Sequence, residues 1–342
     1  MATPDSKPPP AYVTVSALDG GHLTLPERLF VTDADPDKRS TVPSLAFLIQ
    51  HPPTNLNLVF DLGVKRDLNG YTAAQRAHIA QRQPVLVSPD VAASLRTGNP
   101  PLDPARDVDL VILSHVHWDH VGTPSDFSTA TFAVGSGTLD LLKNGGGPLY
   151  PSELFNDDEL PAQRTVEFPP VPSGGVEYDT EEHETRVPEP TPAAPAALSS
   201  LTSKLPAAAS WAWHPIDGFP FPHALDFFGD GSLYVIDTPG HLYGHVNLLA
   251  RLGDRSYVYL GGDCCHDPRI LAGDKDIAIY PDGKGGVRSV HVDTAMARRT
   301  LDRLADFIHD AAKEGEVDIE VVVAHDGVWK EQNRHRFWPG TL

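Results

Sequence analysis

Four potential metal ligands follow one short, largely apolar run of this 342-residue chain. The run Val108–Leu113 predicts a buried strand, and the pattern His-x-His-x-Asp-His begins one residue after it. On an extended segment the side chains of His115 and His117 point the same way, because they are two residues apart. Asp119 and His120 follow where the chain turns. The fold must therefore present a loop carrying four ligands to a cleft at the end of this strand.

The composition limits which metal such a motif can bind. The chain has 16 histidines but only 2 cysteines, so imidazole and carboxylate are the available ligands. These ligands suit Zn²⁺ best, with Mn²⁺ and Fe as alternatives. Cys264 and Cys265 are adjacent, cannot link distant parts of the chain, and are interpreted as buried thiols. Four ligands do not complete two neighbouring sites, so a centre with two metals requires further ligands.

Three later stretches repeat the layout in which an apolar strand ends in a potential ligand. The first is Asp237-Thr-Pro-Gly-His241, where a strand and a tight turn precede a histidine. The second is Tyr259-Leu-Gly-Gly-Asp263, whose glycines allow the backbone to approach its neighbours closely. The third is Val321-Val-Val-Ala-His325. Because each stretch is a strand end, these three side chains are candidates for completing the site.

Strand and helix signals occur in two similar halves, each with strands followed by a helix. This order predicts two sheets packed face to face with helices outside. The predicted strands are Tyr12–Leu18, Arg28–Thr32, Ser44–Gln50, Leu56–Asp61, Val108–Leu113, Ser232–Asp237, His245–Leu252, Ser256–Gly261 and Asp318–Ala324. The predicted helices are Ala73–Gln83, Val91–Leu95 and Val292–Ala312.

Proline is concentrated in one segment. Residues 145–222 hold 14 of the 33 prolines, which predicts an insertion or a long cover loop rather than a property of the core. A disordered linker between two domains is the alternative interpretation. Trp211 and Trp213 lie near the C-terminal end of the segment and favour packing of that part. We interpret residues 145–222 as an insertion or lid, and a deletion of Ser173–Ser203 would test the lid.

The order of these motifs resembles the metallo-β-lactamase superfamily. The order is His-x-His-x-Asp-His, then Thr-Pro-Gly-His, then Gly-Asp, then His, and the likeness covers about residues 12 to 330 apart from the Pro-rich segment. The resemblance implies an α/β fold, an αββα four-layer sandwich of two mixed β-sheets with outer helices. Residues 1–342 would then form a single domain that contains the segment 145–222.

The resemblance also implies which residue binds which metal. One metal would take His115, His117 and His241, the other would take Asp119, His120 and His325, and Asp263 would bridge the two Zn²⁺ ions. His245 is a competing ligand, but the family places the ligand directly after Thr-Pro-Gly, so His245 is assigned to orienting the site by a hydrogen bond. Asp61, in the early strand and turn, resembles the family's structural support. Seven other histidines are assigned no catalytic role: His22, His51, His78, His183, His291, His309 and His335.

The function implied is hydrolysis, in which a hydroxide bridging the metals attacks a carbonyl and Asp119 carries a proton to the leaving group. Asp326 after His325 resembles the N-acyl-homoserine lactonase-like branch more than glyoxalase II, where Glu usually follows that histidine. Those lactonases often place a tyrosine where this chain has His266, which is assigned the same donation to the oxyanion. Opening of a lactone or similar ester is the leading prediction. An acyl thioesterase and a non-catalytic binding protein on this fold are alternatives.

The substrate and the location are predicted more coarsely. Aromatic and histidine side chains close to the motifs predict an apolar pocket for an acyl or aryl group. The net charge of −19 argues against binding to nucleic acid. No run approaches the roughly 18 apolar residues of a membrane span, and the N-terminus lacks the apolar core of a signal peptide, so we expect a cytoplasmic protein. The predicted pocket residues are Trp118, Phe219, Phe221, His223, Tyr243 and Trp329.

Overall fold

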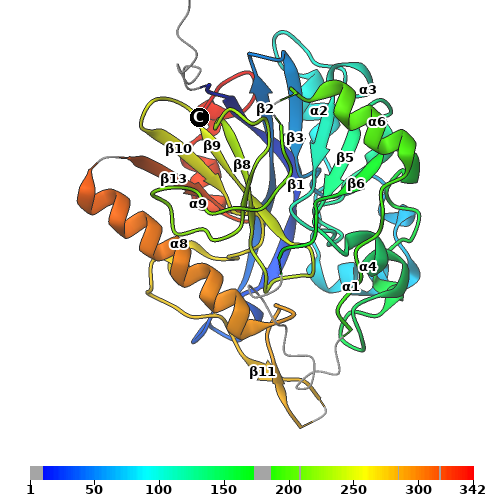
Figure 1. The fold of residues 1–342 in the computed structure, drawn as a ribbon. Coiled ribbons are helices and arrows are strands. Elements are labelled where there is room, and N and C mark those ends of the chain that lie inside the picture. The colour runs from blue at the N-terminus through cyan, green and yellow to red at the C-terminus, as the bar shows by residue number, and fades with distance from the viewer. Residues whose placement is uncertain (1–10, 173–185, 208, 284, 316) are drawn as a thin grey trace, which may run out of the picture.

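Two β-sheets face each other at the centre of the computed structural model, with helices on the outer side of each sheet (Figure 1). The structure describes residues 11–342 except 173–185, 208, 284 and 316. Both sheets are mixed, because each combines antiparallel and parallel neighbours. The predicted four-layer sandwich is therefore confirmed.

The first sheet is built from the N-terminal half of the chain. Its first three strands are antiparallel neighbours, and the later strands join in parallel. Parallel pairing places the ends of β3 and β4 at the same edge of the sheet. In order across the sheet the strands are β1 (Thr14–Pro26), β2 (Arg39–His51), β3 (Leu56–Phe60), β4 (Leu110–Ile112), β5 (Thr131–Val134) and β6 (Thr165–Glu167).

The second sheet comes from the C-terminal half. Its strands are antiparallel neighbours, except that the last strand lies parallel to β10 at the sheet edge. A short antiparallel hairpin lies apart from both sheets. The sheet order is β13 (Asp318–Val322), β10 (Ser256–Leu260), β9 (Val246–Arg251), β8 (Leu233–Asp237) and β7 (Ala224–Asp226), and the hairpin is β11 (Tyr280–Pro281) with β12 (Val287–Arg288).

The long helix α8 covers the outer face of the second sheet (Figure 1). It begins after Asp293, whose side chain accepts a hydrogen bond from the Met296 N–H, and ends at Gly315 in the left-handed conformation. No helix in the described ranges is long and apolar enough to cross a membrane. The helices are α1 (Ala73–Ile79), α2 (Val91–Arg96), α3 (Pro104–Asp107), α4 (Thr138–Asn144), α6 (Pro195–Lys204), α7 (Pro268–Leu271), α8 (Thr294–Glu314) and α9 (Gly327–Gln332).

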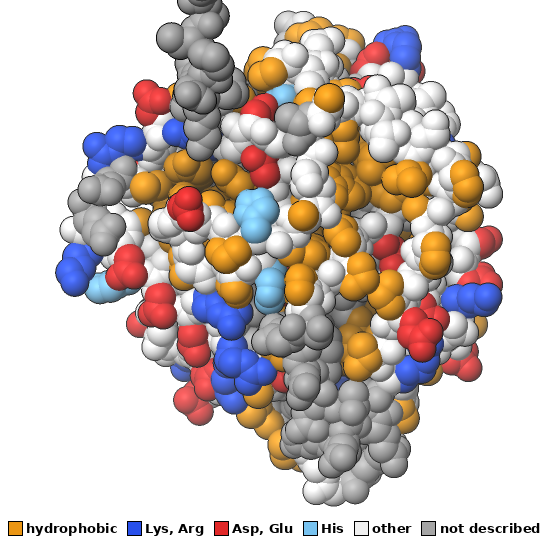
Figure 2. Space-filling model, in the orientation of Figure 1, with side chains coloured by type: hydrophobic (Ala, Val, Ile, Leu, Met, Phe, Trp, Pro, Cys, Tyr) orange, Lys and Arg blue, Asp and Glu red, His pale blue; other side chains and the backbone are white. Residues whose placement is uncertain are grey.

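The main core lies between the two sheets. Alternate residues of facing strands, such as Leu58 and Phe60 from β3 and Val235 from β8, are fully buried there. The residues between them, such as Val59, point to the other side and pack under α2 and α4. Figure 2 shows the surface of the molecule in the orientation of Figure 1. On that face, apolar side chains lie across the central part and charged side chains lie mainly towards the periphery.

Two predicted elements need correction. Arg28–Thr32, predicted as a strand, contains the end of a 3₁₀ turn at Glu27–Leu29, and the Glu27 carbonyl accepts hydrogen bonds from the Phe30 and Val31 N–H groups. The helix predicted over Ala73–Gln83 changes to a 3₁₀ turn at residue 80 and ends before Pro84, which cannot donate a helical hydrogen bond. These differences are local and leave the sandwich unchanged.

Parts of the Pro-rich segment pack on the body of the protein. Ala197 and Leu201 of α6 are buried in the core between the sheets. The Trp211 ring lies 4.9 Å from that of Phe168, and the Trp213 indole N–H donates to the Pro169 carbonyl over 2.7 Å. Residues 173–185 of the predicted lid lie outside the described residues.

Packing of α8 should carry a large share of the stability. Leu304 is fully buried between α8 and the second sheet, so Leu304→Ala should lower the free energy of unfolding by about 2–5 kcal/mol, as measured by urea denaturation. The matched control is Leu198→Ala on α6, because the Leu198 side chain is 51% exposed and its truncation should change stability by less than about 0.5 kcal/mol. Equal losses in the two variants would contradict this assignment.

Candidate metal centre

Four strand ends supply the candidate ligands, one from the first sheet and three from the second. The loop after β4 carries the first motif, and the segments after β8, β10 and β13 carry His241, Asp263 and His325. Gly262 permits the close approach of the third segment. Its φ is +46°, and a Cβ there would lie 2.8 Å from the Ser114 Cβ. The fold therefore brings together at one place residues that lie up to 210 positions apart, from His115 to His325.

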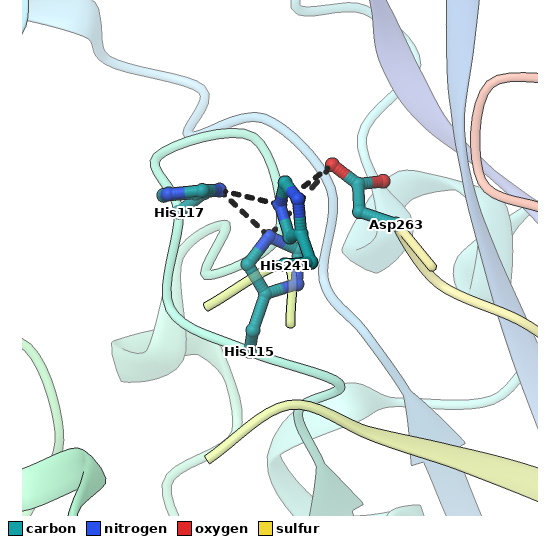
Figure 3. A group of neighbouring side chains, drawn as sticks. All are labelled: His115, His117, His241 and Asp263. Carbon is teal, nitrogen blue, oxygen red and sulfur yellow. Dashed lines mark hydrogen bonds and ion pairs between the residues drawn. The ribbon is translucent and has the colours of Figure 1, made fainter. Parts of the chain in front are cut away.

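The first group of ligand atoms belongs to three histidines and one aspartate (Figure 3). The His117 Nδ1 lies 2.9 Å from the His115 Nε2 and 3.0 Å from the His241 Nε2. The Asp263 Oδ2 lies 3.4 Å from the His241 Nε2 and 3.8 Å from the His115 Nε2. All four side chains point to one common position, which is the arrangement of a metal site.

A second group lies on the other side of Asp263. The Asp263 Oδ1 is 3.1 Å from the Nε2 atoms of both His120 and His325. The Asp119 Oδ2 is 3.6 Å from the His325 Nε2, and Asp119, His120 and His325 form a compact buried cluster. Asp263 thus contributes one carboxylate oxygen to each group, as a bridging ligand would.

Three of the histidine rings make hydrogen bonds on the side that faces away from the metal centre. These bonds decide which ring nitrogen faces the centre. The Ser114 hydroxyl donates to Asp61 and accepts from the His115 Nδ1, 2.9 Å away. The His120 Nδ1 donates to the Asp61 carboxylate over 2.8 Å, and the His325 Nδ1 donates to the Pro43 carbonyl over 2.7 Å. In all three rings Nδ1 is held by an oxygen acceptor, so Nε2 is the nitrogen turned toward the centre.

His241 and His245 differ in what their ring nitrogens do. The backbone N–H of Asp263 donates to the His245 Nε2 over 3.2 Å, and the His245 Nδ1 lies 2.9 Å from the Thr238 hydroxyl. Both nitrogens of His245 are therefore engaged by the protein, whereas the His241 Nε2 faces the first group. This geometry supports the assignment of His241 as a ligand and of His245 as a residue that positions Asp263.

Burial sets the protonation of the first group. It lowers the pKa of His117 to about 3 and holds the pKa values of His115 and His241 well below their usual range. For His120, burial acts in the same direction but the charges of Asp263 and Asp61 outweigh it and raise the pKa. The imidazoles of the first group are therefore neutral near pH 7, the form that binds a metal.

The donor set fits a divalent metal. The His120 Nε2 and the Asp263 Oδ1 are buried and have no hydrogen-bond partner within the described part of the chain. Three imidazole nitrogens and a carboxylate packed this closely in a buried site are costly unless a cation lies among them. Nitrogen and oxygen donors in this number match Zn²⁺.

Two further histidines lie at the centre. The His266 Nε2 is 3.1 Å from the Asp263 Oδ2, and the ring is 9% exposed. The His291 Nδ1 is 3.2 Å from the His241 Nδ1, so His291 positions that ring, although sequence analysis assigned His291 no catalytic role. His291 follows the hairpin β11–β12 in sequence and lies far from every motif. Tertiary packing therefore brings it to the centre.

A cavity of about 290 Å³ opens onto the centre. Trp118 lines it, as predicted, but five other predicted pocket residues do not. Phe219 and Phe221 pack against Phe307 under α8, and Trp329 packs against Phe47. His223 and Tyr243 are also absent from the lining. Closeness to a motif in the sequence was therefore a poor guide to the cavity wall for all five residues. The apolar lining comes instead from residues Leu23, Leu25, Leu29, Phe30, Leu149, Tyr150, Leu154, Phe155 and Val290.

Sequence comparisons find a metallo-hydrolase and a gamma-lactamase among the relatives of this chain. No protein-family model matches the chain. The chain is 25% identical to a Penicillium brevicompactum protein named cytochrome P450 monooxygenase mpaDE', over 98% of this chain but 36% of that one. It is 29% identical to metallo-hydrolase mfmC of Annulohypoxylon moriforme, over 78% of this chain and 62% of mfmC. It is 30% identical to gamma-lactamase FDB1 of Fusarium pseudograminearum, over 65% and 45%. The chain thus spans about a third of the first relative and less than two thirds of the other two.

Solved structures agree on the fold. An N-acyl homoserine lactone hydrolase, solved with the product N-hexanoyl-L-homoserine at its catalytic metal center, matches with a TM-score of 0.59. The match covers 98% of this chain and 100% of that one at 14% identity. A hydrolase of the beta lactamase superfamily matches with a TM-score of 0.50 at 16% identity, over 94% and 91%. These likenesses show that the chain shares the fold of these hydrolases. The shared fold agrees with the four-layer sandwich that the sequence resemblance implied.

The two histidines after β8 can be distinguished by metal analysis. His241→Ala should lose tightly bound zinc, because it removes a nitrogen that faces the first group. His245→Ala should keep a complete set of ligands and bind zinc about 10- to 100-fold more weakly. The measurement is zinc content per chain after dialysis and again at saturating zinc. His309→Ala, at an exposed position of α8, is the control. Full zinc content in His241→Ala alongside loss in His245→Ala would reverse the assignment.

Proposed function

We propose that the protein is a metal-dependent hydrolase that opens a lactone or a similar ester at a centre of two metals. The observation that carries the proposal is the convergence of ligand atoms from four strand ends on the floor of one cavity. His117, Asp119, His241, Asp263 and His325 all line that cavity, so a substrate in it reaches the centre.

Bound at these side chains, two divalent ions would supply a hydroxide near neutral pH and polarise the substrate carbonyl. The chain's own groups provide the remaining chemistry. Asp119 is 6% exposed and lines the cavity, so its carboxylate can transfer a proton to the leaving oxygen. His266 lies beside Asp263 and lines the same cavity, where its ring N–H can donate to the developing oxyanion.

The cavity walls support an acyl or aryl substrate of small size. Eight aliphatic or phenyl side chains line a volume of about 290 Å³, at the lower end of the range for small-molecule sites. The residues Leu149, Tyr150, Leu154 and Phe155 bring part of the Pro-rich segment to this wall, which supports a covering role for residues near 150. We propose a single domain with this insertion, located in the cytoplasm.

Alternative functions use the same centre. An acyl thioesterase needs the same attack on a carbonyl, and the relative named gamma-lactamase suggests a cyclic amide as a further substrate class. A non-catalytic binding protein is disfavoured, because every ligand position predicted for both metals is filled by a residue that the structure brings to the centre.

Turnover of a matched substrate panel tests the proposal. Zinc-loaded protein should hydrolyse γ- and δ-lactones faster than acyl thioesters or γ-lactams of equal carbon number, as followed by acid release. Activity should disappear with a chelator and return with zinc, because the chain alone supplies no other activated nucleophile at this site. A protein that holds two zinc ions yet hydrolyses none of the three classes would refute the hydrolase assignment, and faster thioester turnover would favour the alternative.

Replacing Asp119 tests its proposed proton transfer. Asp119→Asn keeps an oxygen that can face the second group but cannot transfer a proton, so kcat should fall about 100-fold or more with little change in KM. Zinc content is measured alongside, because Asp119 is also a candidate ligand. Asp157→Asn, at an exposed position, is the control. Undiminished kcat in fully loaded Asp119→Asn would exclude this role.

A further inference from the structure

One buried cation in the cavity, Arg82, has no hydrogen-bond or ion-pair partner among the described residues. Arg82 ends the 3₁₀ turn after α1, lines the cavity and is only 8% exposed. Its guanidinium makes no hydrogen bond or ion pair with any residue of the ranges that the structure describes. An arginine stays charged at neutral pH, and burying an unpaired charge is unfavourable. A ligand that supplies a counter-charge would remove this penalty.

A second arginine lines the same cavity from another element. Arg288 lies on β12 and is half-buried, and its guanidinium carbon is 5.5 Å from the Tyr280 ring centroid. Its Nε is buried without a hydrogen-bond partner within the described residues. The charges of both arginines affect the pKa of His78, which also lines the cavity. Burial together with their charges lowers the pKa of His78 to about 4, so the histidine stays neutral.

The carboxylates of the cavity do not neutralise these arginines. Among the lining residues, the only acidic ones are Asp119 and Asp263, and both belong to the metal centre. Two divalent ions would add four positive charges against those two carboxylates. With two divalent ions bound as proposed, the cavity would be positive although the whole chain has a net charge of −19. Such a contrast in sign favours entry of an anion.

We propose that the cavity selects substrates that carry a carboxylate in addition to the bond to be hydrolysed, with Arg82 as its anchor and Arg288 as a second cation. This inference rests on the proposed hydrolase function. The planar guanidinium binds a carboxylate through two parallel hydrogen bonds, which a neutral ester cannot replace. The apolar wall, including Leu25, Phe30 and Phe155, holds the body of the molecule between the two ends.

Fixing the carboxylate at Arg82 would also orient the substrate. A molecule held by a charge at one end can place its carbonyl at the metal centre only if its length matches the cavity. Arg82 and Asp119, the proposed proton donor, line the same cavity. Arg82 and Arg288 are thus specificity-determining residues and take no part in the bond cleavage itself.

The first test compares two lactones that differ in one charge. A γ-lactone with a carboxyalkyl side chain and its methyl ester are offered to zinc-loaded protein. The acid should have the lower KM, and Arg82→Gln should raise that KM about 10- to 100-fold while leaving the KM for the ester nearly unchanged. Arg82→Lys should retain part of the preference. The control is Arg28→Gln, because Arg28 is exposed and absent from the cavity lining.

A binding measurement separates this inference from the proposed function. Metal-free protein is titrated calorimetrically with the same two lactones, which it cannot turn over. Binding of the acid but not of the ester, lost in Arg82→Gln, supports the anion subsite even if the loaded protein hydrolyses neither compound. Equal binding of acid and ester, with hydrolysis intact, overturns the subsite and leaves the hydrolase assignment standing.

Two further outcomes are decisive. If Arg82→Gln does not fold, Arg288→Gln at the half-buried hairpin position carries the same comparison, and an unchanged preference for the acid in that variant overturns the proposal. If Arg82 holds only the acid released by ring opening, Arg82→Gln weakens product inhibition equally for both lactones without changing their relative KM values. That result also overturns substrate selection.

Discussion

One buried carboxylate fixes the loop on which the metal centre depends. Asp61 follows β3 in a left-handed conformation, with φ of 61°, and accepts hydrogen bonds from the Ser114 N–H and hydroxyl, each over 2.7 Å. It also accepts from the His120 Nδ1. Three contacts to the start and the end of the first motif hold its loop in one shape. Because a carboxylate can only accept, the same contacts dictate the tautomer of His120. Backbone position and ligand chemistry are thus set by the same side chain.

The site combines two opposite electrostatic environments. On the floor, neutral imidazoles and two carboxylates form a set of donors that attracts cations. On the wall, Arg82 and Arg288 bring two guanidinium groups to the same cavity, and neither has an ion-pair partner among the described residues. These requirements are compatible only because the arginines come from a turn after α1 and from the β11–β12 hairpin, away from the strand ends that carry the ligands. A substrate in the cavity would contact both environments at once.

The sequence predicted the parts of the structure that depend on local pattern. The strand ends with His241, Asp263 and His325 could be found because an apolar strand followed by a turn and a polar residue is visible in a short window. The cavity wall could not be found this way. Phe221 lies near a motif in sequence but packs under α8, whereas Arg82 and His291 lie far from every motif and reach the centre through tertiary packing. Whether each of these side chains reaches the cavity depends on the direction in which it leaves its strand or turn. That direction cannot be predicted from composition or from distance along the sequence.

The separation of the ligands along the chain has a consequence for biosynthesis. His115 and His117 emerge from the ribosome early, but they share a site with His241, and the second group also needs His325. Each group therefore stays incomplete until the second sheet exists and has docked on the first. During synthesis the early histidines are available to bind metal with low affinity and without geometric selection. Full occupancy of the centre would then mark a chain that has been made through β13 and closed correctly, so the metals report on completed assembly.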